Sequence, residues 1–134
     1  MAEIISGIVT AIAIIILSRL LTRYITTRLF AATILVAIAF IYVGFSLKDN
    51  PVNLLVIEIT FALALYFMAT VGYTRNSRLI AYGIILHGIW DIFHHNKFAI
   101  KTDIPVYWPT YCFIIDIIDG LYFLLVFKRD KKVS

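Results

Sequence analysis

The fold class is decided by the stretch VNLLVIEITFALALYFMATVGY, Val52 to Tyr73. Glu58 is the only carboxylate in this otherwise apolar run. An α-helix of about twenty apolar residues is long enough to cross the hydrocarbon core of a bilayer. The stretch therefore predicts a transmembrane helix.

Stretches of similar length and composition occur on both sides of it, at Ala2–Leu21, Leu29–Leu47, Leu79–His95 and Pro109–Phe127. The chain is 62% hydrophobic and 15% charged, whereas an average soluble domain has about 25% charged residues. The connectors are short, and no linker or low-complexity tract separates a second domain. The sequence thus predicts an all-α, polytopic transmembrane helical bundle of five spans, forming a single integral membrane domain over residues 1–134.

The first span is the weakest of the five, because Ser18 and Arg19 interrupt it. No Lys or Arg precedes its apolar run, which favours a retained helix over a signal peptide. An alternative with four spans and an N-terminal helix lying in the membrane interface stays open.

The basic residues are unevenly divided between the connectors. The net charge is +4, but positive charge in connectors indicates membrane orientation rather than nucleic-acid binding, so no nucleic-acid partner is expected. One set of alternate connectors and the C-terminal segment hold Arg19, Arg23, Arg28, Arg75, Arg78, Lys128, Arg129, Lys131 and Lys132, and the other connectors hold Lys48, Lys97 and Lys101. The positive-inside rule then predicts a multi-pass protein of the cell (cytoplasmic) membrane with its N-terminus outside and its C-terminus in the cytoplasm.

Ionisable residues recur inside the last two predicted spans. Helical spacing places His87, Asp91 and His94 on one face of the fourth span, and it places Asp116 and Asp119 on one face of the fifth. Such groups are costly in the bilayer centre, by roughly 2.5–3.5 kcal/mol each on insertion scales, and they normally face the bundle interior. They therefore mark a functional site, with Gly120 beside them permitting close approach of the two helices.

Glu58 in the third span lies at a similar depth. At roughly 1.5 Å per residue, five of these groups lie about 6–15 Å from the outer ends of their spans, namely Asp91, Glu58, Asp116, His87 and Asp119. We therefore expect a shared polar pocket in the outer half of the membrane.

Two kinds of chemistry suit such a pocket. Helical bundles bind divalent metals through imidazoles and carboxylates from neighbouring helices. The candidate ligands for zinc or iron are therefore His87, Asp91, His94 and Asp116, with Glu58 as a further candidate. Acid and base catalysis by His87, Asp91, Asp116 and Asp119 on a lipid-like or isoprenoid substrate needs no metal. Either reading predicts a membrane-embedded enzyme, with metal-dependent or acid/base chemistry left open.

Two resemblances concern the same residues. His87, Asp91 and His94 partly resemble a histidine box of membrane hydroxylases and desaturases, with Asp91 in the place of a histidine, and this resemblance implies iron. Those families use more histidines than the three in this chain.

The segments HGIWDIFHH and VYWPTYCFIID together resemble the shared motif of a small prokaryotic integral-membrane family of unknown function. The resemblance covers the last two spans and implies a multi-helix membrane fold without assigning an activity. Its signature, H-x(3)-D-x(2)-H-H and W-P-x(2)-C-x(3)-D, is carried by His87, Asp91, His94, His95, Trp108, Pro109, Cys112 and Asp116.

Two other function classes stay open. Intramembrane Asp, Glu and His also form proton relays and ion paths, so an ion- or proton-translocating component is the alternative. The same groups also occur as interhelical hydrogen-bond partners, which would fit a structural subunit of a membrane complex. Membrane lipid is an expected partner in every case, and a homo-oligomer or partner subunits would be compatible with all of them.

Overall fold

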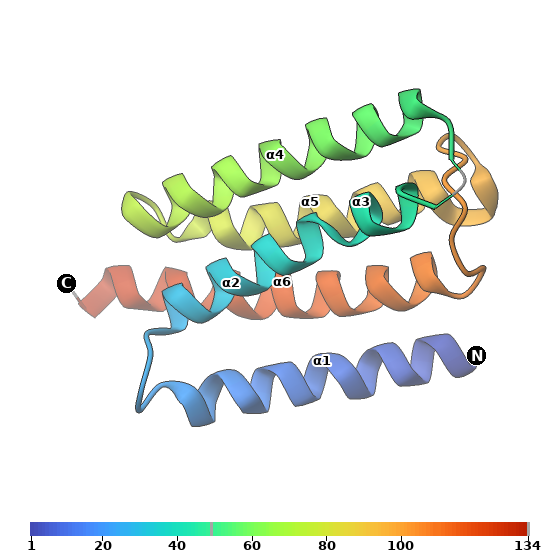
Figure 1. Cartoon of the computed structure of the whole chain (residues 1–134). Helices are drawn as coiled ribbons and strands as arrows, with labels where there is room; N and C mark the ends of the chain where they lie inside the picture. The colour runs from blue at the N-terminus through green and yellow to red at the C-terminus, as the bar shows by residue number, and fades with distance from the viewer. Residues whose placement is uncertain (49, 134) are drawn as a thin grey trace.

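The chain folds into a bundle of helices that run alternately in opposite directions (Figure 1). This computed structural model describes residues 1–48 and 50–133, without the side chains of 130–133. The elements are α1 (Ala2–Leu21), α2 (Thr27–Ala39), α3 (Ile41–Ser46), α4 (Val52–Thr74), α5 (Arg78–His94), the 3₁₀ turn η1 (His95–Lys97) and α6 (Trp108–Val133). No strand occurs within the described ranges. The predicted all-α bundle is confirmed.

Within the described residues, four helical stretches are long and apolar enough to cross a membrane, namely Ala2–Leu21, Thr27–Ser46, Val52–Thr74 and Trp108–Arg129. Their outer surfaces expose large apolar side chains such as Ile12, Val56, Phe67 and Leu125. A soluble monomer rarely exposes so much apolar surface. The chain is therefore a membrane-embedded protein.

The predicted fourth span corresponds to α5, which has 17 residues and is shorter than those four. One face of it packs against α2, α4 and α6, and the opposite face exposes apolar side chains such as Tyr82, Leu86 and Ile89. Its buried face combines small and apolar residues with His87, Asp91 and His94. Because the polar groups face the bundle interior, a helix with this many of them fits into an apolar bundle.

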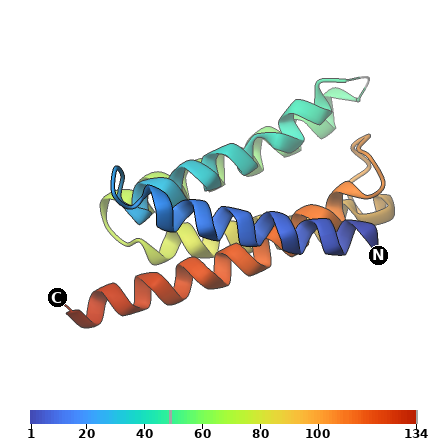
Figure 2. The same cartoon turned by 90° about the horizontal axis from the view of Figure 1, so that it is seen from below.

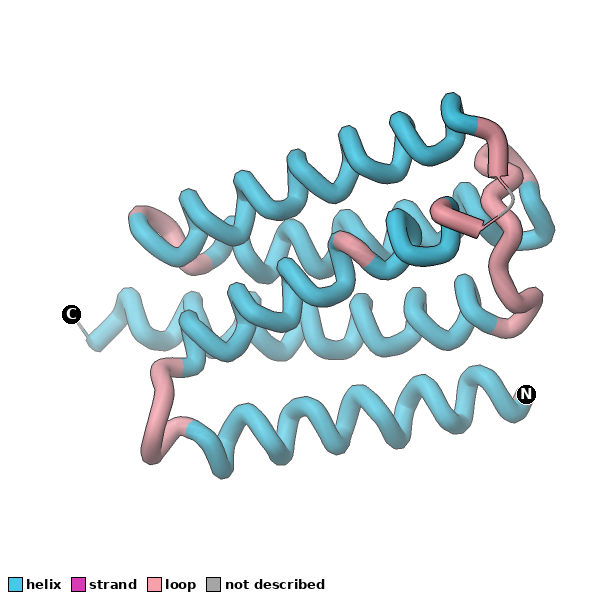
Figure 3. The backbone as a smooth tube through the Cα atoms, in the orientation of Figure 1, coloured by secondary structure: helices cyan, strands magenta, loops and turns pink. Residues whose placement is uncertain are grey.

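The predicted second span is broken into α2 and α3 at Phe40, whose φ of −96° and ψ of 0° are not helical. Figure 3 shows the break as a short loop segment inside the second helical rod. The helix resumes at Ile41, immediately before Tyr42. Neither proline nor glycine occupies residues 39–41, which is why the sequence gives no sign of the break.

The helix α6 extends further than the predicted span Pro109–Phe127. It begins at Trp108, with Pro109 in the first turn, where its missing N–H is harmless. It continues through the basic segment to Val133. The predicted end was placed by hydropathy, which marks only where the apolar stretch ends. Lys and Arg are good helix formers, so the helix continues beyond that point.

The helix α1 packs lengthwise on α6 and does not lie apart from the bundle. Gly7 approaches Ile114 and Tyr111, and the hydroxyls of Thr10 and Tyr111 are 3.0 Å apart. The five-span prediction requires this arrangement. Both views place the two termini at opposite ends of the bundle (Figures 1 and 2).

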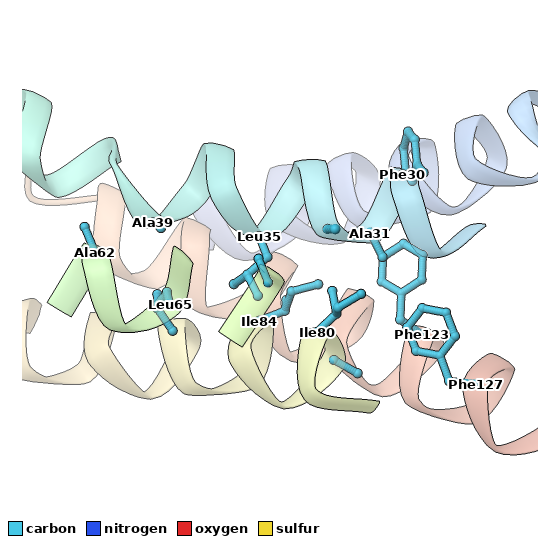
Figure 4. Packing of buried hydrophobic residues seen from close by; sticks show 13 residues of the cluster. Phe30, Ala31, Leu35, Ala39, Ala62, Leu65, Ile80, Ile84, Phe123 and Phe127 are labelled. Carbon is cyan, nitrogen blue, oxygen red and sulfur yellow. The ribbon is translucent and has the colours of Figure 1, made fainter. Parts of the chain in front are cut away.

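The bundle interior is divided along its length. One half holds the apolar core, in which Phe30, Leu35, Ile84 and Phe123 pack among the α2, α4, α5 and α6 helices (Figure 4). This half lies toward the end where α2 and α5 begin. The other half holds the buried ionisable residues Glu58, His87, Asp91, His94 and Asp116.

The charges at the two ends are also divided as predicted. One end, called here the arginine-rich end, carries Arg19, Arg23, Arg28, Arg75, Arg78, Lys128 and Arg129. Lys48, Lys97 and Lys101 lie at the opposite end. The side chains of Lys131 and Lys132 lie outside the described part of the chain.

Candidate metal and proton-transfer site

The site is built first on one face of α5. His87 and Asp91 are completely buried and His94 is 1% exposed, whereas the next residue, His95, is exposed. Residues spaced by three and four lie on one face of a helix, so these three side chains enter the bundle together. The predicted stripe on this helix is confirmed.

Small residues bring α6 close to that face. A Cβ added at Gly88 would lie 3.1 Å from the Cβ of Asp116, and one added at Gly120 would lie 2.5 Å from Ile85. Only residues without side chains permit such an approach of two helices. The close contact predicted at Gly120 is confirmed, and it brings Asp116 within reach of α5.

His87, Asp91 and Asp116 form a compact cluster, called here the Asp–His group. The Nδ1 of His87 donates to the Oδ2 of Asp116 at 2.6 Å and lies 4.0 Å from the Oδ2 of Asp91. One ligand atom from each residue can be chosen such that all lie within 4.8 Å of one another. The two helices thus place two carboxylates around one imidazole.

Tyr42 from α3 completes this cluster. Its hydroxyl donates to the Oδ1 of Asp91 at 2.5 Å, and its ring stacks on the imidazole of His94 with centroids 4.0 Å apart. The side chain is only 1% exposed. One oxygen of Asp91 is therefore held by Tyr42, and the other faces the remainder of the group.

Several polar atoms of the group remain available. Among the described residues, the Nε2 of His87 and the Oδ2 of Asp91 are buried without a hydrogen-bond partner. An unpaired buried polar atom is unfavourable by about 1–3 kcal/mol. Such atoms are the expected mark of a site that binds something else.

The spacing suits a small divalent cation. Zinc–ligand bonds of about 2.0–2.2 Å in tetrahedral geometry place the ligand atoms roughly 3.3 Å apart. The separations from the Nδ1 of His87, 2.6 Å to Asp116 and 4.0 Å to Asp91, bracket that value, so a cation bound there would replace the proton that His87 donates to Asp116. Three protein ligands with one open position are the arrangement of a catalytic zinc site.

A second network, called here the Glu58 network, uses the other predicted residues. The Oε1 of Glu58 accepts from the Nε2 of His94 at 2.6 Å and from the hydroxyl of Thr102 at 2.7 Å. Its Oε2 accepts from the indole of Trp90 at 3.1 Å. The Nδ1 of His94 donates to the carbonyl of Trp90 at 3.0 Å.

Both ring nitrogens of His94 and both oxygens of Glu58 thus have partners. The structure brings these two residues together with each other, beside the Asp–His group and not inside it. Their role as metal ligands stays a prediction. In this arrangement they join α4, α5 and the connector after η1.

Asp119 and Cys112 lie on the same helix as Asp116 but outside the group. Asp119 is fully buried, and neither of its oxygens has a partner among the described residues. Cys112 is a buried free thiol. The structure therefore leaves Asp119 as an isolated carboxylate one helical turn beyond Asp116.

A hollow of about 470 Å³ opens at the end of the bundle where α5 meets α6. Its walls are largely apolar, and Asp91 contributes to its lining. The lining residues are Asp91, Ile92, His95, Asn96, Phe98, Pro109, Thr110 and Phe113. This pocket, called here the Asp91 pocket, lies beside the Asp–His group.

The rim of this pocket has an unusual backbone. Asn96 and Lys97 both have positive φ, 51° and 55°. Asn adopts this conformation readily, but for Lys it is uncommon. Strained residues cluster at functional sites, so the rim conformation agrees with a ligand-binding role for the pocket.

Sequence reasoning missed Tyr42 and Thr102. Tyr42 stands in an apolar run with no local pattern around it, and Thr102 lies in a connector. Both act across elements that are distant in the chain. A signal for Trp90 was present, since it stands four residues before His94 and therefore on the same face of α5.

Comparison with known proteins identifies a family and nothing more specific. A sequence-family profile described as "Family of unknown function (DUF6010)" matches residues 2–129. No curated protein and no solved structure matches the chain. The family match carries no activity, so any function has to be argued from the site.

Proposed function

The chain belongs to this family of unknown function, and we propose from its site that it is a membrane-embedded enzyme acting on a lipid-like or isoprenoid substrate. One observation carries the proposal. Asp91 belongs to a buried three-residue cluster with free ligand atoms, and it also lines an apolar pocket. A reactive polar centre at the end of an apolar pocket is the usual form of a small-molecule site.

The pocket supports an apolar substrate. Ile92, Phe98, Pro109 and Phe113 offer hydrocarbon contacts, while His95, Asn96 and Thr110 offer polar groups. A long-chain molecule with one polar end suits this mixture. Such a molecule would enter from the surrounding bilayer.

We propose that the Asp–His group holds a divalent cation, zinc or iron, through His87, Asp91 and Asp116. A bound cation of this kind supplies Lewis-acid polarisation of a substrate oxygen or activates a water molecule. Tyr42 fixes the orientation of Asp91 by its hydrogen bond. Without a cation, the Asp116–His87 pair could move a proton, because Asp116 orients the imidazole and leaves its Nε2 free.

The direct test is metal content. The protein, purified in mild detergent without chelator, is analysed by elemental mass spectrometry beside His87→Ala, Asp116→Asn and the control His95→Ala. We expect about one cation per chain in the wild type and in His95→Ala, and loss in the other two variants. Equal metal content in all four proteins would refute the site. Absence of metal from every sample, even after dialysis against zinc or iron(II), would leave proton transfer as the chemistry.

A second candidate function is proton translocation, and Asp119 favours it. Asp91, His87, Asp116 and Asp119 form a series of buried ionisable groups that leads from the pocket toward the apolar half. Chains of this kind mark proton relays. In proteoliposomes with an imposed pH gradient, Asp119→Asn should then abolish proton flux, and a flux equal to that of wild type would exclude this function.

A further inference from the structure

A second candidate site lies on the outer surface where α2 runs beside α4. It consists of two hollows that meet at Tyr73. One is apolar and runs between the helices, and the other is polar and lies at the arginine-rich end. An apolar hollow joined to a polar one is complementary to an amphipathic molecule.

The apolar hollow has a volume of about 450 Å³. On α2 its lining residues are spaced by three and four, so they form one face of that helix. The lining is Leu29, Ala32, Thr33, Val36, Ala37, Ala69, Thr70 and Tyr73. The hydroxyls of Thr33 and Thr70 donate to carbonyls of their own helices, at 2.9 and 3.0 Å, so neither needs a further partner in the hollow.

The polar hollow has a volume of about 590 Å³ and is lined by Thr26, Thr27, Arg28, Tyr73 and Thr74. Arg28 is held there, because its Nη1 donates to the carbonyl of Tyr73 at 3.3 Å. The other N–H groups of the guanidinium remain able to bind an anion. The first turn of α2 adds positive potential, since Thr27 begins a helix of 13 residues.

Charge complementarity identifies the occupant. The hollow lies at the arginine-rich end, and its own lining contains no carboxylate. Basic pockets between helices bind the headgroups of anionic lipids, and a guanidinium matches phosphate oxygens with paired hydrogen bonds. We infer that this site binds an anionic phospholipid, with the phosphate at Arg28 and the first turn of α2 and an acyl chain in the groove between α2 and α4.

The test compares two lipids that differ only in headgroup charge. Delipidated protein in mild detergent is titrated with phosphatidylglycerol or phosphatidylcholine of the same acyl chains, and bound lipid is counted by native mass spectrometry. We expect preferential binding of phosphatidylglycerol by the wild type. Arg28→Gln should lower that affinity about tenfold, because it removes a charge-assisted hydrogen bond.

Matched variants separate the site from general attraction to positive charge. Arg23→Gln makes the same charge change in the connector just before α2, outside the lining, and should keep the preference. Ala37→Leu fills the exposed groove without touching the core and should lower the affinity for both lipids. Far-ultraviolet circular dichroism and size-exclusion chromatography establish that each variant is folded.

Four results would overturn the inference. The first is equal affinity of the wild type for both lipids, and the second is an equal loss in Arg28→Gln and Arg23→Gln. The third is unchanged binding in Ala37→Leu, because this result would mean that the acyl chain does not lie in the groove. Glycerol phosphate without acyl chains, bound as tightly as the lipid, would point to a soluble anion and would also contradict the inference.

Discussion

Single residues in the polar half of the bundle divide into those with free atoms and those without. His87 and Asp91 keep unpaired atoms, whereas Glu58 and His94 have partners at every polar side-chain atom. Free atoms can bind a ligand, and paired atoms hold helices together. The two networks therefore respond differently to substitution, although they lie side by side.

Replacing Tyr42 by Phe tests how Asp91 is oriented. The ring keeps its stacking on His94, but the hydrogen bond to Asp91 is lost. Loss of such an outer hydrogen bond typically weakens metal binding by about 10- to 100-fold. Competition with a chromogenic chelator measures the affinity, with the exposed Tyr66→Phe as control. An affinity unchanged in Tyr42→Phe would show that Asp91 needs no support from this hydroxyl.

Replacing His94 by Ala tests the Glu58 network. Glu58 would remain buried without its imidazole partner, and breaking a buried pair in this way destabilises proteins by about 3–5 kcal/mol. We expect a lower free energy of unfolding, measured by denaturant titration, together with unchanged metal content. His95→Ala, at an exposed position, is the control. Loss of metal with normal stability would move His94 into the metal site.

At the scale of helices, the contact between α5 and α6 assembles the Asp–His group, and Gly120 tests it. A Cβ there would lie 2.5 Å from Ile85 and 3.2 Å from its backbone nitrogen. Gly120→Ala should therefore separate the helices, destabilise the bundle by about 1–3 kcal/mol and reduce metal affinity. Thermal unfolding and chelator competition measure the two effects.

Gly44→Ala is the matched control for that substitution. Nothing lies within 4 Å of the Cβ that it would add. Alanine is also the better helix former by about 0.5–1 kcal/mol, so this variant should be at least as stable as the wild type. Equal behaviour of the two variants would mean that the helix contact tolerates a methyl group.

The helices, and the polar face of each of the last two, were predictable from the sequence, because both depend on local spacing. His87, Asp91 and His94 share a face through intervals of three and four residues, and hydropathy located every long helix. The partition of the polar residues into two networks was not predictable. It depends on Tyr42 and Thr102, whose contacts connect segments that are far apart in the chain.

The break of the second span at Phe40 was not predictable from the sequence for a related reason. A helix that pauses without proline or glycine does so under tertiary constraints. The prediction therefore treated residues 29–47 as one straight span, and Tyr42 remained an ordinary aromatic residue within it.

At the scale of the whole molecule, the unequal charge of the two ends predicts the orientation in the membrane. The arginine-rich end should lie in the cytoplasm by the positive-inside rule. In intact cells, a membrane-impermeant maleimide should label Lys101→Cys and leave Arg23→Cys unlabelled. Wild type, in which Cys112 is buried, is the background control. The reverse labelling pattern would invert the topology.

The polar face of α5 has a consequence for how the protein is made. A helix that carries two histidines and an aspartate on one face inserts poorly into lipid by itself, since polar side chains are unfavourable in lipid, by up to about 2.5–3.5 kcal/mol for an aspartate at a helix centre. The earlier helices supply Tyr42 to Asp91 and Glu58 to His94, but His87 gains its partner only when α6 has left the ribosome and supplies Asp116. The last two helices should therefore leave the translocon together as a hairpin. A nascent chain that stops before residue 108 would release α5 back toward water.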